Sequence, residues 1–146
     1  MEINTEHKKV KIVFSTRKLV KLTKELNGKN FENIWFKAMN NSDIEALATI
    51  ILEFAENEAG VKSFKTIDEV YDFIDDYKEE KNKSYKDIFD EMAGAINDEG
   101  FFYEKMKEEE LKDKIKNPLS AIDIDMEALA NKAAEKAADQ AFMQQA

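Results

Sequence analysis

The stretch Ser42-Asp-Ile-Glu-Ala-Leu-Ala-Thr-Ile-Ile-Leu-Glu-Phe-Ala55 decides the fold of this chain. Ser42 and Glu45 have the spacing of a capping box, in which two side chains bond the unpaired N–H groups at the start of a helix. Apolar residues then recur every three or four positions, which is the period of one helical face. These positions are Ile44, Leu47, Ala48, Ile51, Phe54 and Ala55. The pattern predicts an amphipathic helix that begins at Ser42 and runs until Gly60.

The same arrangement recurs twice farther along the chain. The Thr66/Glu69 pair precedes one apolar stripe, and the Ser84/Asp87 pair precedes another. The stripes are Ile67, Val70, Tyr71, Ile74 and Tyr77, and then Tyr85, Ile88, Phe89, Met92 and Ile96. Two more amphipathic helices are therefore expected, each marked by its own start signal.

Two shorter stripes lie before residue 42. They are Leu19, Leu22 and Leu26, and then Phe31, Ile34, Trp35 and Ala38. Asn27-Gly28 separates them and supplies a residue that tolerates positive φ, as the end of a helix often requires. Two short helices are predicted here.

The first fourteen residues follow a different period. Val10, Ile12 and Phe14 alternate with other residues, so they share one face of an extended strand. Together with Glu2–Asn4 they flank a polar turn, which predicts an N-terminal β-hairpin. Because two strands are marginally stable alone, the apolar face must pack on helices.

The chain changes character after Gly100. A dense run of charge covers 104–116, and Asn117-Pro118 then breaks any regular structure, because proline lacks a backbone N–H group. An alanine-rich stretch follows from Met126 to Ala146, and alanine favours helix while burying little area. The predicted organisation is a folded domain over 1–117 and a helical or partly disordered tail over 118–146. The predicted fold class is mainly α (α+β), with the hairpin packed on a bundle of about five amphipathic helices and an alanine-rich helical tail at the C-terminus.

Composition excludes several functions. The net charge of −9 argues against general nucleic-acid binding, which depends on neutralising phosphates. The absence of cysteine removes disulfides and thiolate metal sites. No apolar stretch approaches the ~20 residues of a membrane span. Nothing at the N-terminus has the pattern of a signal peptide, so an intracellular protein is expected.

Charge is distributed unevenly along the chain. Eight lysine or arginine residues precede residue 30, against three glutamates, while the remainder is strongly acidic. A solvated face on the first helix is the favoured interpretation. The asymmetry also fits a surface that steers an acidic partner, or self-association head to tail.

No catalytic centre is evident. His7 is the only histidine and lies in a predicted turn among lysines. The carboxylates at 72–80 lie mostly along one side of a predicted helix. They could bind a divalent cation or form a solvated charged face, and the nearby lysines favour the solvated face. The stretch from Asp123 resembles the start of an EF-hand loop, but Ala128 and Ala134 replace its glycine and its bidentate glutamate. The sequence therefore predicts a non-enzyme with no cofactor and no metal.

Aromatic residues supply the candidates for partner contact. Adjacent aromatics project in different directions from a helix or a strand, so one small domain has difficulty burying all of them. Core packing remains the default for Trp35, whereas core packing and partner contact fit the 101–103 cluster equally well. The candidate partner-binding residues are Trp35, Phe36, Phe101, Phe102, Tyr103, Leu129, Phe142 and Met143.

The layout resembles a known family. Lys9-Val-Lys-Ile-Val-Phe14 runs straight into Thr16-Arg-Lys-Leu-Val-Lys-Leu22, and Asn41-Ser-Asp-Ile-Glu-Ala-Leu47 and Val70-Tyr-Asp-Phe-Ile74 follow. This order is similar to the tail assembly chaperones of long-tailed, siphovirus-type bacteriophages of Gram-positive bacteria. There a K-F-x-F-x-T strand enters an L-x-x-L helix, and an E-V-x-D-F-I-like helix comes later. The resemblance covers about residues 2–100. It departs from the family in lacking a glycine in the first hairpin turn.

The resemblance implies a function through protein binding. Such chaperones bind the long helical tape measure protein, keep it soluble and help to recruit tail tube subunits, often with a longer form made by ribosomal frameshifting. They act in the host bacterial cytoplasm and are not expected in the mature virion. The alternatives are a small acidic helical adaptor or regulatory protein that binds a host factor, and an enzyme with a carboxylate-bound metal at 72–79.

Overall fold

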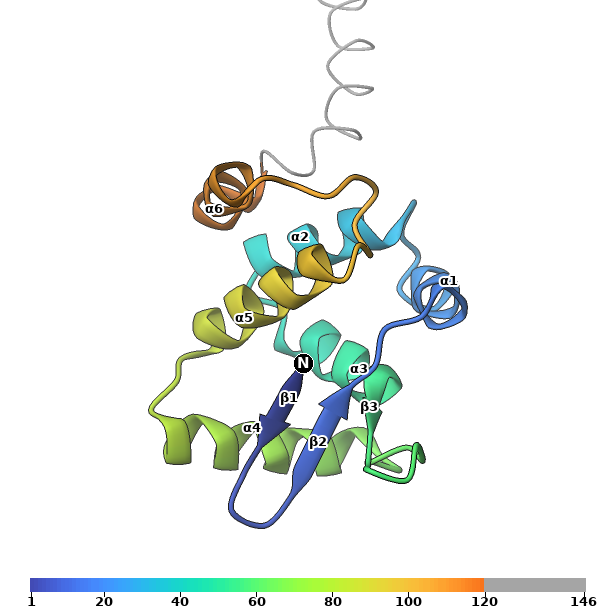
Figure 1. Ribbon diagram of the computed structural model, residues 1–146, viewed down its shortest axis with the longest axis vertical. Coiled ribbons are helices and arrows are strands. Elements are labelled where there is room, and N and C mark those ends of the chain that lie inside the picture. Colours follow the sequence, from blue (N-terminus) through green and yellow to red (C-terminus); the bar gives the residue numbers. More distant parts are fainter. Residues whose placement is uncertain (120–146) are drawn as a thin grey trace, which may run out of the picture.

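Residues 1–119 are described in the computed structural model, where they form six helices and a three-stranded antiparallel sheet (Figure 1). The elements are β1 (Glu2–Asn4), β2 (Lys9–Ile12), α1 (Thr16–Glu25), α2 (Phe31–Asn40), α3 (Ile44–Phe54), β3 (Ala55–Glu56), α4 (Ile67–Lys81), α5 (Tyr85–Asp98) and α6 (Glu108–Lys116). The mainly helical α+β fold with an N-terminal hairpin is confirmed. The predicted alanine-rich helix lies outside the described residues.

The N-terminal hairpin has the predicted pairing and faces. Ile3 pairs with Val10 in antiparallel register, and Thr5–Lys8 form the turn. Val10 and Ile12 are buried, while Lys9 and Lys11, which alternate with them, are exposed. As Figure 1 shows, the hairpin lies beside α3 and α4, so helices cover its apolar face.

The helix that begins after Ser42 does not run until Gly60, as the sequence predicts. It ends at Phe54, and the next two residues form β3, in which Ala55 pairs with Ile12 of β2. The carbonyl oxygen of Phe54 accepts a hydrogen bond of 2.9 Å from the N–H group of Val13. Pairing with the hairpin therefore replaces the helical hydrogen bonds that this segment would otherwise make.

The start of α3 also differs from the prediction by one residue. Its N-cap is Asp43, whose carboxylate accepts a hydrogen bond of 3.0 Å from the N–H group of Ala46. Ser42 instead has a left-handed backbone, with φ at +52°. The Ser42/Glu45 capping box is wrong because a tight turn after α2 places Ser42 outside the helix.

The other two start signals are at the predicted places. Ser84 and Asp87 form a complete capping box at α5. Thr66 caps α4 by accepting from the N–H group of Glu69, but the Glu69 carboxylate reaches the N–H group of Lys65 instead of closing the box. Two of three caps were therefore correct in position, and one of them has the full reciprocal geometry.

The connection between α1 and α2 is close-packed. Asn27 takes the positive φ of +52° there, and Gly28 meets a different requirement. A Cβ atom on Gly28 would lie 2.2 Å from Cγ1 of Ile34, a core residue of α2. The glycine lets the backbone pass directly against that side chain, and α1 is thereby held next to the start of α2.

Candidate partner-binding groove

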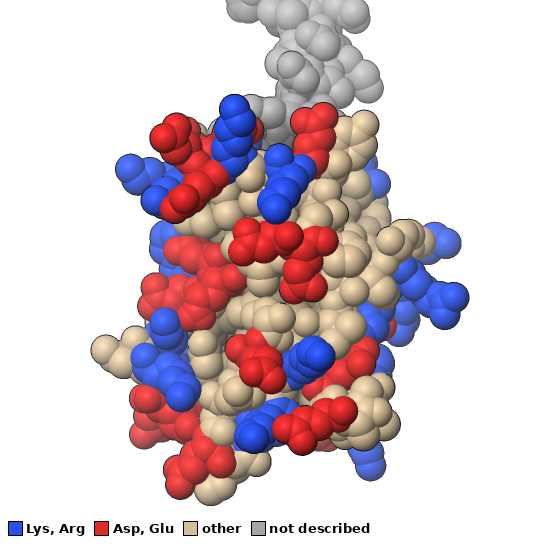
Figure 2. Space-filling model, in the orientation of Figure 1, with Lys and Arg blue, Asp and Glu red and all other residues tan. Residues whose placement is uncertain are grey.

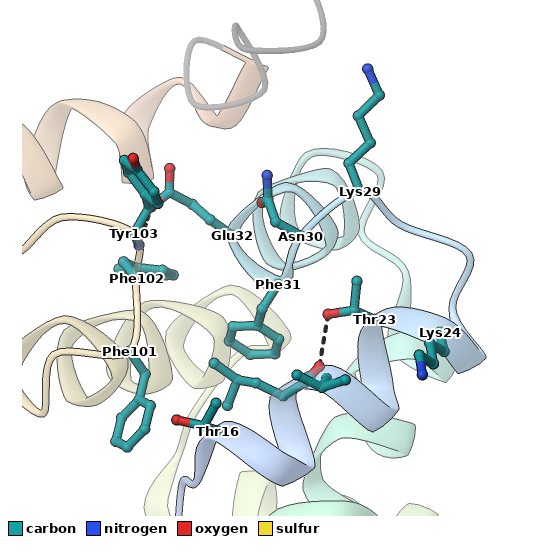
Figure 3. Close-up of a pocket in the computed structure, with 12 residues that line it drawn as sticks. Thr16, Thr23, Lys24, Lys29, Asn30, Phe31, Glu32, Phe101, Phe102 and Tyr103 are labelled. Atoms are coloured by element: carbon teal, nitrogen blue, oxygen red, sulfur yellow. Dashed lines mark hydrogen bonds between the residues drawn. The ribbon is translucent and has the colours of Figure 1, made fainter.

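An apolar groove lies between α1, the first turn of α2 and the segment that follows α5 (Figure 3). Its volume is about 430 Å³. The residues that line it are Thr16, Leu19, Val20, Thr23, Lys24, Lys29, Asn30, Phe31, Glu32, Phe101, Phe102 and Tyr103. We call this feature the aromatic groove. It brings together three parts of the chain that are far apart in sequence.

The α1 wall of the groove follows from helical spacing. Thr16, Val20 and Thr23 lie three or four positions apart, so they fall on one side of α1. Leu22 is fully buried and fixes the opposite side of the helix in the core. Ser15 caps the helix by accepting a hydrogen bond from the N–H group of Lys18. Val20 consequently remains 49% exposed, facing the groove.

The second wall is the aromatic segment 101–103. Gly100 has a φ of +80° and turns the chain back after α5. Phe102 is buried, and its ring centroid lies 5.2 Å from that of Phe36. The ring centroids of Phe101 and Phe14 are 5.7 Å apart. Tyr103 is 85% exposed. Two aromatic rings thus anchor the segment, and the third presents its surface to solvent.

Glu32 joins this segment to α2. One carboxylate oxygen, Oε1, accepts a hydrogen bond of 3.2 Å from the N–H group of Tyr103, and Figure 3 shows the two residues side by side at the edge of the groove. Partial burial raises the pKa of the Glu32 carboxyl, while the Tyr103 hydrogen bond and the positive charge of Lys114 act in the opposite direction. Burial therefore opposes ionisation of Glu32, while its hydrogen bond to the Tyr103 backbone favours the charged form.

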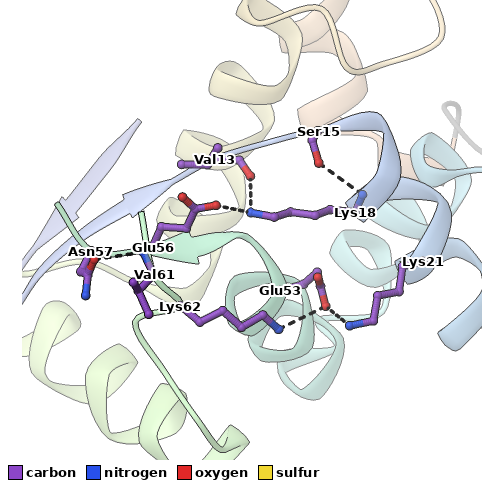
Figure 4. Close-up of polar contacts among 9 residues, drawn as sticks. All are labelled: Val13, Ser15, Lys18, Lys21, Glu53, Glu56, Asn57, Val61 and Lys62. Carbon is purple, nitrogen blue, oxygen red and sulfur yellow. Dashed lines mark hydrogen bonds and ion pairs between the residues drawn. The ribbon is translucent and has the colours of Figure 1, made fainter. Parts of the chain in front are cut away.

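Ion pairs hold α1 on the side away from the groove (Figure 4). The ammonium group of Lys18 lies 2.6 Å from Glu56, and that of Lys21 lies 2.7 Å from Glu53. Glu53 is largely buried and also faces Lys62 at 3.6 Å. A buried carboxylate is costly without a partner, so the pair with Glu53 binds Lys21 of α1 to the end of α3, while Lys18 joins α1 to β3. The wall that carries Val20 is therefore fixed in place.

The predicted partner-binding residues fall into three groups. Trp35 and Phe36 are fully buried, which agrees with core packing, the default expected for Trp35, and leaves neither ring at the surface of the domain. Their rings pack against Phe89 and Phe102, because α2 is enclosed by neighbouring elements on more than one side. Phe101, Phe102 and Tyr103 lie together at the groove, although Phe102 is itself buried. The predicted contacts in the tail are Leu129, Phe142 and Met143, which lie outside the described residues.

Val20 was missed by the sequence reasoning. The sequence contains one signal for it: Val20 follows the apolar stripe residue Leu19, yet it lies off the stripe that Leu19, Leu22 and Leu26 define. A single exposed apolar residue is common on protein surfaces, so its significance here comes from the apolar lining of the groove around it.

The carboxylates of α4 are arranged as a solvent-facing surface. Asp72, Asp75, Asp76 and Glu79 are exposed. Within residues 1–119, no group of three or more His, Cys, Asp or Glu side chains has an arrangement that could hold a metal ion. None of the helices in that range has the length and apolar character needed to cross a membrane.

No protein-family model matches the chain, and no curated protein or solved structure shows significant similarity to it.

Proposed function

We propose that this chain is a tail assembly chaperone of a long-tailed bacteriophage that infects Gram-positive bacteria. It binds the tape measure protein in the host cytoplasm, keeps it soluble and helps to recruit tail tube subunits, the latter through a longer frameshifted form. It leaves before the virion matures. The observation that carries the proposal is the aromatic groove, which offers apolar surface that the domain does not bury in its own core.

The groove suits an amphipathic helix as its ligand. A long helical client presents apolar side chains at every third or fourth position, and a groove of this kind takes them from one face of the helix. Val20 of α1 and Tyr103 after α5 are exposed residues of the lining, to which Phe31 and Phe101 also contribute. Full burial of one such side chain contributes about 1.5–3 kcal/mol. A few contacts of that size support reversible binding of single copies, and many copies cover a long client.

Co-expression with the tape measure candidate tests the proposal. The soluble fraction of the client is measured with wild-type chain, with Val20→Glu and with Val61→Glu. Val61 is 59% exposed and lies outside the groove, so it is a matched control. Wild type and Val61→Glu are expected to keep the client soluble, and Val20→Glu to lose this effect because a charge in the groove opposes apolar contact. A client that is equally insoluble with and without the wild-type chain contradicts the proposal.

The second candidate is a small acidic adaptor that binds a host factor. It rests on the same aromatic groove, occupied by one helix of a host factor in a defined complex. Sedimentation of the complex separates the two functions. An adaptor gives a small, fixed stoichiometry. For a tape measure chaperone, many copies of the chain bind each client molecule, and their number increases with the length of the client.

A further inference from the structure

The aromatic groove carries opposite charges on its two sides. Lys24 and Lys29 line it at the end of α1 and the connection to α2, and Glu32 lines it beside Tyr103. Figure 3 shows the two lysines on the right and Glu32 on the left of the groove. In Figure 2, blue side chains gather over α1 at the right of the view, next to an uncharged tan strip. Apolar surface is thus bordered by a basic edge.

The lysines of α1 have different surroundings. Lys18 and Lys21 are used within the domain, where they pair with Glu56 and Glu53. Lys24 is exposed at the last turn of α1, and its ammonium group makes no ion pair within residues 1–119. It lies on the groove side of the helix, four positions from Val20. A charge in this position is next to any helix that contacts Val20.

The opposite wall has mixed charge. Glu32 accepts the Tyr103 hydrogen bond there, and its pKa, which burial raises, is lowered by the positive charge of Lys114 and raised, to a smaller extent, by Glu104. A bound helix with carboxylates on both edges would meet attraction from Lys24 on one side and opposing charges on the other. The groove therefore distinguishes the two edges of the helix that occupies it.

We infer that the aromatic groove selects an amphipathic helix with carboxylates along one edge of its apolar stripe, and that this acidic edge lies against Lys24 at the last turn of α1. The inference rests on the proposed role of the groove as the client site and specifies the chemistry of the client. It also fixes the direction of the bound helix, since reversing a helix in a groove exchanges its two edges. The preference runs against the overall charge of −9, which disfavours acidic ligands in general.

Two synthetic helical peptides test the inference with the full chain. Both carry leucines at helical spacing. One has glutamates along one edge of the stripe and glutamine elsewhere, and the other has glutamine at all those positions. Affinity is measured by fluorescence anisotropy at low salt. The acidic-edge peptide is expected to bind about threefold more tightly, because exposed ion pairs contribute ~0.2–1 kcal/mol each. Added salt should remove the difference.

Variants on one helix assign the effect to Lys24. Lys24→Glu is expected to abolish the preference for the acidic edge while the glutamine peptide still binds. Arg17→Glu is the matched control, because Arg17 is also exposed on α1 and does not line the groove. It should keep the preference. Circular dichroism verifies that both variants fold. Lys24→Gln provides a second measurement: it removes the positive charge without reversing it, and the preference for the acidic edge should disappear.

The remaining outcomes overturn the inference in distinguishable ways. Equal affinity for the two peptides contradicts the acidic edge but leaves the groove as a client site. Binding only after Leu129→Ser and Phe142→Ser in the full chain means that the chain's own tail occupies the groove. Binding only on dilution, with a dimer in sedimentation, means that a second copy does. No binding in any variant contradicts the inference, and co-expression with the tape measure candidate still decides the proposed function.

Discussion

The N–H group of Tyr103 donates a hydrogen bond of 3.2 Å to Oε1 of Glu32, although the two residues are 71 positions apart in the chain. This contact joins the segment after α5 to the first turn of α2, and the two together form one side of the aromatic groove. One partly buried carboxylate therefore positions the exposed tyrosine ring that is available to a partner.

Stability should depend on the ionisation of Glu32. Burial raises the pKa of this carboxyl above its ordinary value of 4.5, so the folded state binds the proton more tightly than the unfolded state. The contribution of the protonated Glu32 carboxyl to the free energy of unfolding is fully present below pH 4.5. It is lost as the pH rises through the raised pKa of the folded state. Glu32→Gln keeps an oxygen for Tyr103 and has no charge to desolvate. It should gain stability relative to wild type between pH 4 and pH 7, as measured by urea unfolding. A difference that does not change with pH would contradict this origin.

The cap of α3 gives a second prediction. Asp43→Ala should reduce the free energy of unfolding by about 1 kcal/mol, because the N–H group of Ala46 loses its acceptor. Ser42→Gly should have the opposite sign, with a gain of up to roughly 1 kcal/mol, since glycine adopts the positive φ of this position without strain. Chemical denaturation measures both. A larger loss for Ser42→Ala than for Asp43→Ala would restore Ser42 as the cap.

Gly28 and Gly94 should respond to alanine with opposite signs. A Cβ atom at residue 28 would overlap Ile34, so Gly28→Ala should cost about 1–3 kcal/mol through overpacking. Gly94 lies within α5, and a Cβ atom there meets nothing within 4 Å. Gly94→Ala should therefore stabilise the protein by about 0.5–1 kcal/mol, the difference in helix propensity. Thermal denaturation of the two variants provides the comparison, and loss of stability in both would show that α5 is packed more tightly at this point.

Trp35 provides a spectroscopic test of the corrected site. It is the only tryptophan and is fully buried, with its ring centroid 5.5 Å from that of Phe89. The native protein should have blue-shifted emission that iodide does not quench, and unfolding should shift it to the red. Binding of a helical peptide at the groove should leave the accessibility of Trp35 to iodide unchanged. Iodide quenching in the native state would place Trp35 at the surface again.

The helices were predictable because their signals are local. The Ser84 cap and the apolar spacing of α5 depend on residues within one turn of one another, and both appear in the structure as expected. The two residues of β3 give no such signal. Ala55 continues the apolar spacing of α3, and only its pairing with Ile12, a residue 43 positions earlier, changes it to a strand.

The groove was only partly predictable for a related reason. The 101–103 cluster is recognisable in sequence, but whether an aromatic residue is buried depends on what packs against it. Trp35 and Phe36 project in different directions from α2, which suggests that one remains at the surface. Neighbours on both sides of α2 bury the two rings. Val20 is left exposed because it lies on the side of α1 away from the buried Leu22 and from the ion pair of Lys21 with Glu53.

The anchoring of α1 has a consequence for how the protein is made. Glu53 and Glu56, which hold Lys21 and Lys18, follow those lysines by 32 and 38 residues, and Tyr103 follows Glu32 by 71. In a nascent chain, α1 emerges before its anchors exist, and the aromatic wall emerges later still. The groove is therefore complete only after residue 103 has left the ribosome. Under the proposed function, a shorter nascent chain has no complete groove and does not compete with finished copies for a client.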